Sequence, residues 1–390
     1  MANATQFGVG GSGGIAVTQA PMVKGWCPGA YQPMMAADGL VMRVRPKLAR
    51  ITVDQAAGLC DIALRYGSGH IDLTNRANLQ IRGVAEADHD AVLMALGGLG
   101  LLDEDPAMER RRNILVAPFW TTGDMTATLT AQLLTRLGDL PDLPTKVGFA
   151  VDCDPVGPLL TNDPADIRLE QGEGGLILRA DGCATGRPVT AHTAIPALIE
   201  MAVWLADHVT PQARRMAAVV AGAPLPKAWT VKPPLTPQPR PELGATSGGP
   251  LIGAPFGQID ARALVRVLGD AQGLRVTPWR AFVLEGAAPP DDPAFVTTAD
   301  DPLMRVDACP GAPLCASASV ETRDLARRLA PMVTGSLHVS GCAKGCARAR
   351  RADLTLVGRD GTFDLVRGGH AGDTPLKTGL SPDKLLTGEF

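Results

Sequence analysis

The stretch Gly69-His-Ile-Asp-Leu-Thr-Asn-Arg-Ala-Asn-Leu-Gln-Ile-Arg-Gly83 alternates apolar and polar residues on both sides of a polar turn. This alternation predicts two β-strands joined by a tight connection. Upstream, residues 39–45 alternate like a further strand, and residues 52–66 carry apolar side chains at helical spacing. The first part of the chain is therefore predicted to form a strand, a helix and two more strands.

The second part of the chain repeats this order. A strand is predicted over residues 251–256, a helix over 260–269, and a strand, turn and strand over 273–286. The later segments match as well: each part ends in a predicted hairpin and contains one further helix, with the hairpins at 165–182 and 352–369 and the helices at 126–137 and 322–329. The repetition predicts a duplicated α+β fold whose halves face each other across a central cleft, a usual place for a large ligand.

The overall composition is that of a globular chain with more than one domain. It has 390 residues, 45% hydrophobic and 20% charged, with a net charge of -3. This charge gives no reason to expect a nucleic acid or an anionic membrane as partner. No long apolar run is present, and the first twenty residues lack a secretory signal, so a soluble cytoplasmic protein is expected.

The breaks in composition divide the chain into six segments. Glycines near the N-terminus indicate a flexible tail, and closely spaced prolines indicate an extended connector without secondary structure. The expected segments are a tail at 1–20, domains at 21–98 and 105–223, a linker at 224–250, and domains at 251–300 and 301–388.

Four of the eight cysteines are clustered near the C-terminus. Five residues separate Cys309 from Cys315, and three separate Cys342 from Cys346. Four thiolates in two short loops can surround one metal centre, and nearby small residues let backbone N–H groups approach the sulfurs. Zinc also accepts four thiolates, but the five-residue spacer fits a [4Fe-4S] cluster better. Cys27, in Gly25-Trp-Cys-Pro-Gly29, is consistent with either a turn or a substrate loop.

This cysteine spacing resembles that of the sulfite and nitrite reductase hemoproteins. The segment from Val339 to Gly358 resembles their cluster segment, and Leu73-Thr-Asn-Arg-Ala-Asn-Leu-Gln-Ile-Arg82 resembles their tetrapyrrole motif Thr-x-Arg-x-x-x-Gln. The resemblance implies paired ferredoxin-like half-domains plus two α/β domains around a central cleft. It also implies that the second α/β domain carries a [4Fe-4S] cluster beside a tetrapyrrole.

Within this superfamily the sequence resembles the precorrin-3B synthase family. The resemblance rests on the opening Lys24-Gly-Trp-Cys-Pro-Gly-Ala-Tyr-Gln-Pro-Met34, and on Gly148 and Lys344, where the reductases have other residues. It implies an oxygen-dependent monooxygenase of cobalamin biosynthesis that hydroxylates C20 of precorrin-3A and closes a γ-lactone. A mononuclear non-haem iron has been attributed to this family, and electrons are expected from a separate reductase.

Two other functions stay open at this point. A siroheme-dependent sulfite or nitrite reductase would use Cys346 to bridge the cluster and the siroheme iron. A non-catalytic Fe–S electron carrier would need the cluster alone, although such a carrier does not require so large a paired fold.

Precorrin-3A carries many carboxylates, so arginines are the expected ligands. Arg43 and Arg45 lie at i and i+2 on one strand and share a face, which is either a binding surface or a solvated one. The resemblance implies that the substrate-binding residues are Arg43, Arg45, Thr74, Arg76, Gln80, Asn113, Lys344 and Arg348, and that the catalytic ones are Arg112 and Lys146.

The histidines give only a weak indication of a second iron. His70 and Asp72 share one strand face, as two ligands of a facial triad would, but no third ligand can be named and an ordinary strand pair is favoured. His338 is interpreted as a core or surface residue. The sequence therefore does not locate a second iron.

Overall fold

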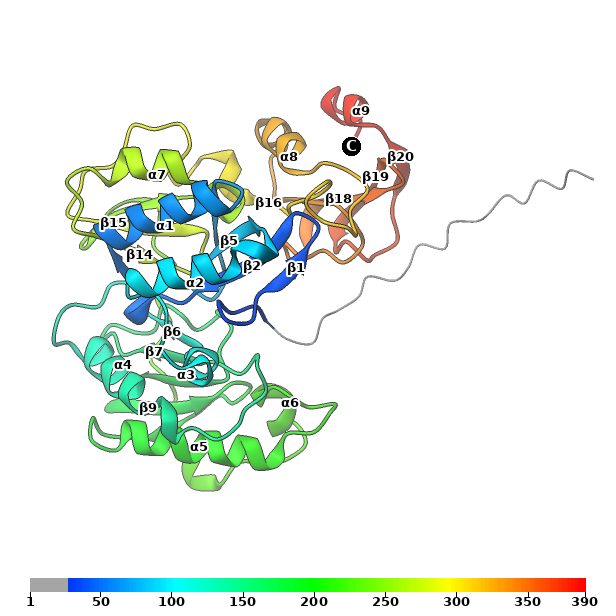
Figure 1. Cartoon of the computed structure of the whole chain (residues 1–390). Helices are drawn as coiled ribbons and strands as arrows, with labels where there is room; N and C mark the ends of the chain where they lie inside the picture. The colour runs from blue at the N-terminus through cyan, green and yellow to red at the C-terminus, as the bar shows by residue number, and fades with distance from the viewer. Residues whose placement is uncertain (1–26) are drawn as a thin grey trace, which may run out of the picture.

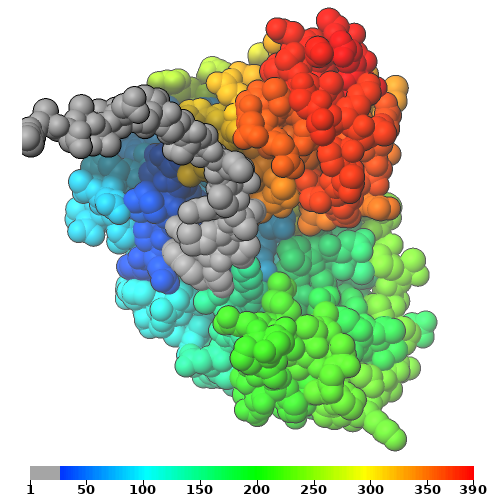
Figure 2. Space-filling model, turned by 90° about the vertical axis from the view of Figure 1, so that its right-hand side faces the viewer, coloured from blue at the N-terminus to red at the C-terminus, as the bar shows by residue number. Residues whose placement is uncertain are grey.

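The computed structural model describes residues 27–390, so the predicted tail at 1–20 lies outside the described residues. Within residues 27–390 the strands form four five-stranded sheets. Two of these sheets lie together in one part of the molecule, and each of the other two forms a part of its own beside it (Figure 1). In the space-filling view the C-terminal part, in orange and red, lies above the green middle part (Figure 2). The α+β architecture predicted from the sequence is confirmed.

Two of the sheets are antiparallel and exchange a strand. One has the order β1(Met34–Ala36), β2(Gly39–Val44), β5(Leu79–Val84), β4(His70–Leu73), β13(Gln258–Asp260). The other has the order β11(Gly244–Thr246), β12(Gly249–Gly253), β15(Ala281–Glu285), β14(Gly273–Val276), β3(Arg50–Thr52). Ile259 of β13 pairs with Ile71, and Ile51 of β3 pairs with Leu274. Each sheet is therefore completed by the other half of the chain.

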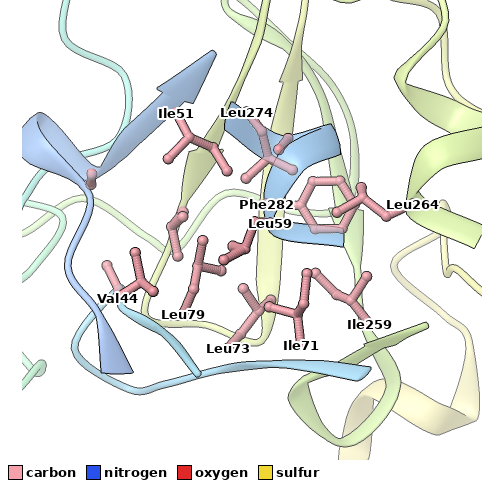
Figure 3. Packing of buried hydrophobic residues seen from close by; sticks show 14 of the residues in the cluster. Val44, Ile51, Leu59, Ile71, Leu73, Leu79, Ile259, Leu264, Leu274 and Phe282 are labelled. Carbon is pink, nitrogen blue, oxygen red and sulfur yellow. The ribbon is translucent and has the colours of Figure 1, made fainter. Parts of the chain in front are cut away.

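The helices connected to the strands of these two sheets share one hydrophobic core. α1(Val53–Tyr66) begins at a capping box formed by Thr52 and Gln55, and α7(Ala261–Leu268) begins at Asp260, whose carboxylate accepts the N–H of Ala263. α1, α7 and α2(His89–Gly98) lie together on this side of the molecule (Figure 1). Side chains from both halves meet beneath them, including Ile51, Ile71, Ile259, Leu274 and Phe282 (Figure 3).

The other two sheets repeat a second pattern. One has the order β10(Arg187–Pro188), β9(Gly175–Ala180), β8(Ile167–Gly172), β7(Phe149–Asp152), β6(Ile114–Val116). The other has the order β16(Val306–Ala308), β17(Leu337–Ser340), β18(Ala352–Arg359), β19(Thr362–Gly369), β20(Lys377–Leu380). In each sheet three parallel strands are followed by two antiparallel ones. Both predicted hairpins are confirmed.

Helices cover these two sheets. α4(Met125–Thr135) and α5(Ala194–His208) pack on the first, and α8(Arg323–Leu329) packs on the second. The shorter helices α3(Pro106–Arg111), α6(Met216–Val220) and α9(Pro382–Leu386) complete the set described. Within residues 27–390, none of the helices combines the length and the apolar character needed to cross a membrane.

The proline-rich segment at 224–250 is not the purely extended connector that was expected. It contains a 3-10 turn, η4(Lys227–Trp229), and the strand β11. The N–H of Gly186 donates to Lys232 O at 2.7 Å, and the N–H of Leu235 donates to Gln171 O at 2.9 Å. The expectation is wrong here because the residues between the prolines keep their backbone groups, and these pair with Gly186, next to β10, and with Gln171, near the end of β8.

Candidate functional site

A cavity of about 360 Å³ lies between the first antiparallel sheet and the cysteine loops of the C-terminal part. Arg43 on β2 and Gln80 on β5 line it, and so does Thr74, in the turn after β4. Cys309 and Cys346 line the same cavity. Tertiary structure thus brings three of the predicted substrate-binding residues together with two of the predicted cluster ligands.

Strand register explains how Arg43 reaches this wall. Arg43 and Gln80 are direct partners in the antiparallel pair β2–β5, so their side chains lie next to each other on one face. The guanidinium of Arg43 donates to Gln80 Oε1 from Nε at 3.2 Å and from Nη2 at 2.7 Å. The thiol of Cys27 is hydrogen-bonded to the same guanidinium, and burial lowers the Arg43 pKa. Arg43 therefore faces the cavity with a neutral amide and a thiol as its neighbours.

The two cysteine loops meet because they follow adjacent parallel strands. β16 and β17 are neighbours, Cys309 directly follows β16, and Cys342 follows β17 by two residues. The N–H of Gly341 donates to Cys309 Sγ at 3.2 Å. Burial raises the pKa of the Cys346 thiol, and the nearby thiols of Cys342, Cys309 and Cys315 add to this effect. All four cysteines thus lie in one neighbourhood.

Glycines allow the loops to approach each other closely. A Cβ on Gly341 would lie 2.6 Å from Ala318 Cβ, and a Cβ on Gly311 would lie 2.7 Å from Thr322 Oγ1. Gly311 also has φ +70°, a conformation that favours glycine. The prediction that small residues bring a backbone N–H to a sulfur is confirmed at Gly341 and Cys309.

The four cysteines are ligands of the chemical type that an iron–sulfur cluster requires. Four thiol groups on two adjacent loops, one of them already accepting a backbone N–H, are the ligands that a [4Fe-4S] cluster takes. The side chains are not closed into a metal site in the structure, where no group of three His, Cys, Asp or Glu in residues 27–390 has that geometry. The cysteines thus fit the cluster by chemistry and location, and their ligation stays a prediction.

Arg45 and Arg112 are held by carboxylates of their own neighbourhood. Arg45 forms a buried ion pair with Glu109. Arg112 contacts Asp103 at 2.7 Å and also donates to the carbonyl of Arg45. Neither arginine lines the cavity. Their contacts fix the segment that follows β2 against α3.

Three further predicted residues form a small group beside the turn that carries Thr74. The hydroxyl of Thr74 accepts the N–H of Arg76 at 3.3 Å, and Arg76 Nη2 donates to Lys146 O at 2.9 Å. Asn113 Nδ2 donates to Val147 O at 2.7 Å. Arg76, Asn113 and Lys146 are thus brought together, although they do not line the cavity.

Arg348 and Lys344 lie on the cysteine side. Arg348 contacts Asp307 at 2.6 Å, and Asp307 lines the cavity. Lys344 is exposed between Cys342 and Cys346 and does not line the cavity. Both residues thus border the cysteine loops.

The cavity has charged residues that sequence reasoning did not select. Arg82 pairs with Asp38 at 2.9 Å, and Arg280 pairs with Asp307 at 3.0 Å. Arg323, at the start of α8, also lines the wall. Arg82 ends the tetrapyrrole motif and alternates with Gln80, which was a signal for a shared face. Arg280 and Arg323 carry no comparable local signal.

The two histidines considered for a second iron have separate surroundings. His70 Nδ1 lies 3.1 Å from Ser68 O, and His70 does not line the cavity, whereas Asp72 does. His338 is buried in β17, and burial lowers its pKa to about 4 because the charged form is poorly solvated there. His338 thus has the core position expected as one of its two interpretations.

Three kinds of comparison relate this chain to known proteins: family models, curated relatives and solved structures. The nitrite/sulfite reductase ferredoxin-like half domain family matches residues 32–99. A protein from Sinorhizobium sp named precorrin-3B synthase is 31% identical over 423 residues, covering 93% of this chain and 86% of that protein. The structure of the Mycobacterium tuberculosis NirA protein matches with a TM-score of 0.61 and 17% identity, covering 89% of this chain and 79% of that one. This last likeness shows the fold.

Proposed function

The chain belongs to the precorrin-3B synthase family, and on that premise we propose that it hydroxylates C20 of precorrin-3A with O2 and closes a γ-lactone. The observation that carries this proposal is the cavity, whose wall combines arginines with two of the four clustered cysteines. A substrate rich in carboxylates needs such cations, and a redox reaction needs an electron source close to the substrate.

The chain's own residues would bind and orient the macrocycle. Arg43 is hydrogen-bonded to the neutral side chain of Gln80 and forms no ion pair with another residue of 27–390, so its charge is available for a substrate carboxylate. Arg82 and Arg280 lie on the same wall and are held by aspartates. Holding the macrocycle at several points would fix C20 relative to the oxidant, as catalysis by orientation requires.

The cysteine loops would provide the redox centre. Cys309, Cys315, Cys342 and Cys346 would hold a [4Fe-4S] cluster, which supplies electrons one at a time when bound. Because Cys309 and Cys346 line the cavity, their loops would keep that centre at the cavity wall. A separate reductase is the proposed source of the electrons.

Gly148 favours the synthase over a sulfite or nitrite reductase. A Cβ on Gly148 would lie 2.7 Å from Asn113 Nδ2 and 3.0 Å from Asn113 O. The lysine that the reductases are expected to have at this position could therefore not be placed without moving Asn113. This crowding at Gly148 supports the absence of the second cation that a small doubly charged anion would require.

Protein purified without air provides the first test. We expect the broad absorbance of an iron–sulfur cluster without siroheme bands, since the tetrapyrrole is proposed to be the substrate. Strong siroheme bands would support the reductase alternative. A protein that contains the cluster but binds no tetrapyrrole in titrations would support the electron-carrier alternative.

The second test supplies precorrin-3A, O2 and a reductant to the cluster-containing protein. The expected product is the hydroxylated lactone, identified by its mass and by incorporation of labelled oxygen. If the cluster is intact and precorrin-3A binds but no lactone forms, the proposed reaction is wrong.

A further inference from the structure

Two charged side chains of the cavity wall, Asp72 and Arg323, form a looser pair than their neighbours. Arg323 Nη2 lies 3.8 Å from Asp72 Oδ1. The two other Arg–Asp pairs that contribute an arginine to this wall, those of Arg82 and Arg280, have separations of 2.9 and 3.0 Å. A pair held at this greater distance makes no hydrogen bond and is the easiest of the three to exchange for another partner.

Both members of the pair have buried polar atoms without a hydrogen bond. Among residues 27–390, Asp72 Oδ1 and Arg323 Nε are two such atoms. The side chains are only 13% and 16% exposed, so water does not fully replace the missing partners. Unsatisfied buried charged groups are costly, and a ligand that supplies the missing hydrogen bonds is therefore favoured.

The pair also joins two parts of the chain across the cavity. Asp72 lies on β4 of the first antiparallel sheet, and Arg323 begins α8 on the cysteine-bearing sheet. Both line the cavity together with Arg43. A carboxylate that entered between the two walls would meet Arg323 on the cysteine side and Arg43 on the other.

We propose that Arg323 binds a carboxylate of the tetrapyrrole substrate and that Asp72 is the counter-ion which this carboxylate replaces. The inference rests on the proposed function, because it takes precorrin-3A as the ligand. Burial raises the pKa of Asp72, and Asp38 adds to this effect, although the charges of Arg323, Arg82 and His70 act in the opposite direction. Asp72 therefore takes up a proton, and so loses its negative charge, more easily than an ordinary aspartate when the substrate carboxylate approaches.

The test measures precorrin-3A binding to the cluster-containing protein without O2 and without reductant. Replacing Arg323 by Gln should weaken affinity roughly tenfold to a hundredfold, because a charge-assisted hydrogen-bonded pair is lost. Arg323→Lys should lie between, since lysine keeps the charge but not the planar fork. Arg328→Gln is the matched control, because Arg328 is on the same helix and is exposed, and it should bind like the wild type.

Asp72→Asn should not weaken binding. It preserves the size of the side chain and removes the charge that competes for Arg323, so binding should be as tight as in the wild type or tighter. A loss of affinity as large as that of Arg323→Gln would overturn the counter-ion role. It would indicate that Asp72 orients the arginine.

Iron content and cluster absorbance are recorded for every variant. Unchanged binding by Arg323→Gln would overturn the proposal. A loss of iron in Arg323→Gln would also overturn it, because Arg323 lies within electrostatic range of Cys309 and would then act on the cluster. Lactone formation by the wild type is measured separately, so failure of the proposed reaction is distinguished from failure of the assignment to Arg323.

Discussion

The two α/β sheets of this protein have the same strand order but different contents. Both place three parallel strands beside two antiparallel ones. In the first sheet, β7 ends at Asp152 and is followed by Cys153, and both residues are buried. In the second, β17 leads into Gly341 and Cys342, at the loops that border the cavity. The comparison shows that the loops after the parallel strands of one scaffold differ in content: those of the first sheet border a separate cavity of about 420 Å³, and those of the second carry the clustered cysteines.

The placement of charge differs in the same way. The first sheet encloses the ion pair of Glu170 on β8 with Arg179 on β9. The second has Asp307, which pairs with Arg280 and Arg348 and lines the cavity. Charged groups thus pair within one sheet and line the cavity beside the other.

The largest expected effect comes from the cysteine that follows β17. Cys342→Ser should remove most cluster iron and abolish activity, because a hydroxyl is a poor replacement for a thiolate ligand. Cys153→Ser is the matched control in the first sheet, where burial raises the thiol pKa and Sγ lies 3.7 Å from Leu169 O. Iron and sulfide per chain are measured for both. A full four-iron complement in Cys342→Ser would contradict the ligand assignment.

The buried pair of the first sheet should affect stability and not the cluster. Glu170→Gln leaves Arg179 without its counter-charge, at a cost of about 3–5 kcal/mol in the free energy of unfolding. Urea unfolding provides the measurement, and iron content per folded chain should stay at the wild-type level. Replacing both partners by Met should restore much of the stability, since no buried charge then remains. Cluster loss in folded Glu170→Gln would show that the two sheets are not separable in this way.

Asp152 should make the stability of the first sheet depend on pH. Burial raises its pKa from 3.8 to about 6, against the opposing effect of the N–H groups of Leu160 and Leu159. The folded state therefore holds the proton more tightly than the unfolded state. Its contribution to stability is complete below about pH 4 and is lost as the pH rises through about 6, by roughly 2–3 kcal/mol.

The effect of Asp152 is measured as the difference between the unfolding free energies of the wild type and of Asp152→Asn. Subtracting the free energy of unfolding of Asp152→Asn from that of the wild type at each pH cancels the other titrating groups. The difference should fall between pH 4 and pH 7, because asparagine does not titrate. A constant difference over this range would mean that the Asp152 pKa is not raised.

The smallest expected effect is at the start of β7. Gly148→Ala places a methyl group against Asn113 Nδ2 and should cost about 1–3 kcal/mol through crowding. Gly138→Ala is a suitable control, because a Cβ at Gly138 would meet no atom within 4 Å. Thermal unfolding of both variants tests the difference. Equal stability of the two would remove the steric argument against a lysine at position 148.

Local pattern was enough for most of the fold. The alternation around Gly69 to Gly83 and its repetition predicted the main strands and helices of both halves. The exchanged strands β3 and β13 escaped prediction because each has only three residues, too few to show a period of two. Their place in the opposite sheet is a property of the assembled core.

Part of the candidate site could also be predicted from the sequence, and part of it could not. Arg43, Thr74 and Gln80 were predicted from a motif and do line the cavity. Arg45 and Arg112 were predicted with them, but Glu109 and Asp103 provide carboxylates that hold them elsewhere. No periodicity could show this, since Glu109 comes from a different segment than Arg45, and Asp103 and Arg112 lie outside α3 at its two ends.

The sequence by itself determined the four clustered cysteines and the duplicated order of elements. Both are local properties, because ligand spacing within a loop and apolar periodicity within an element need no knowledge of distant segments. Only the tertiary structure decided which charges face the cavity. Asp72 and Arg323 meet there because β4 and α8 pack on opposite sides of it, and whether a charge is free or paired depends on what burial places beside it.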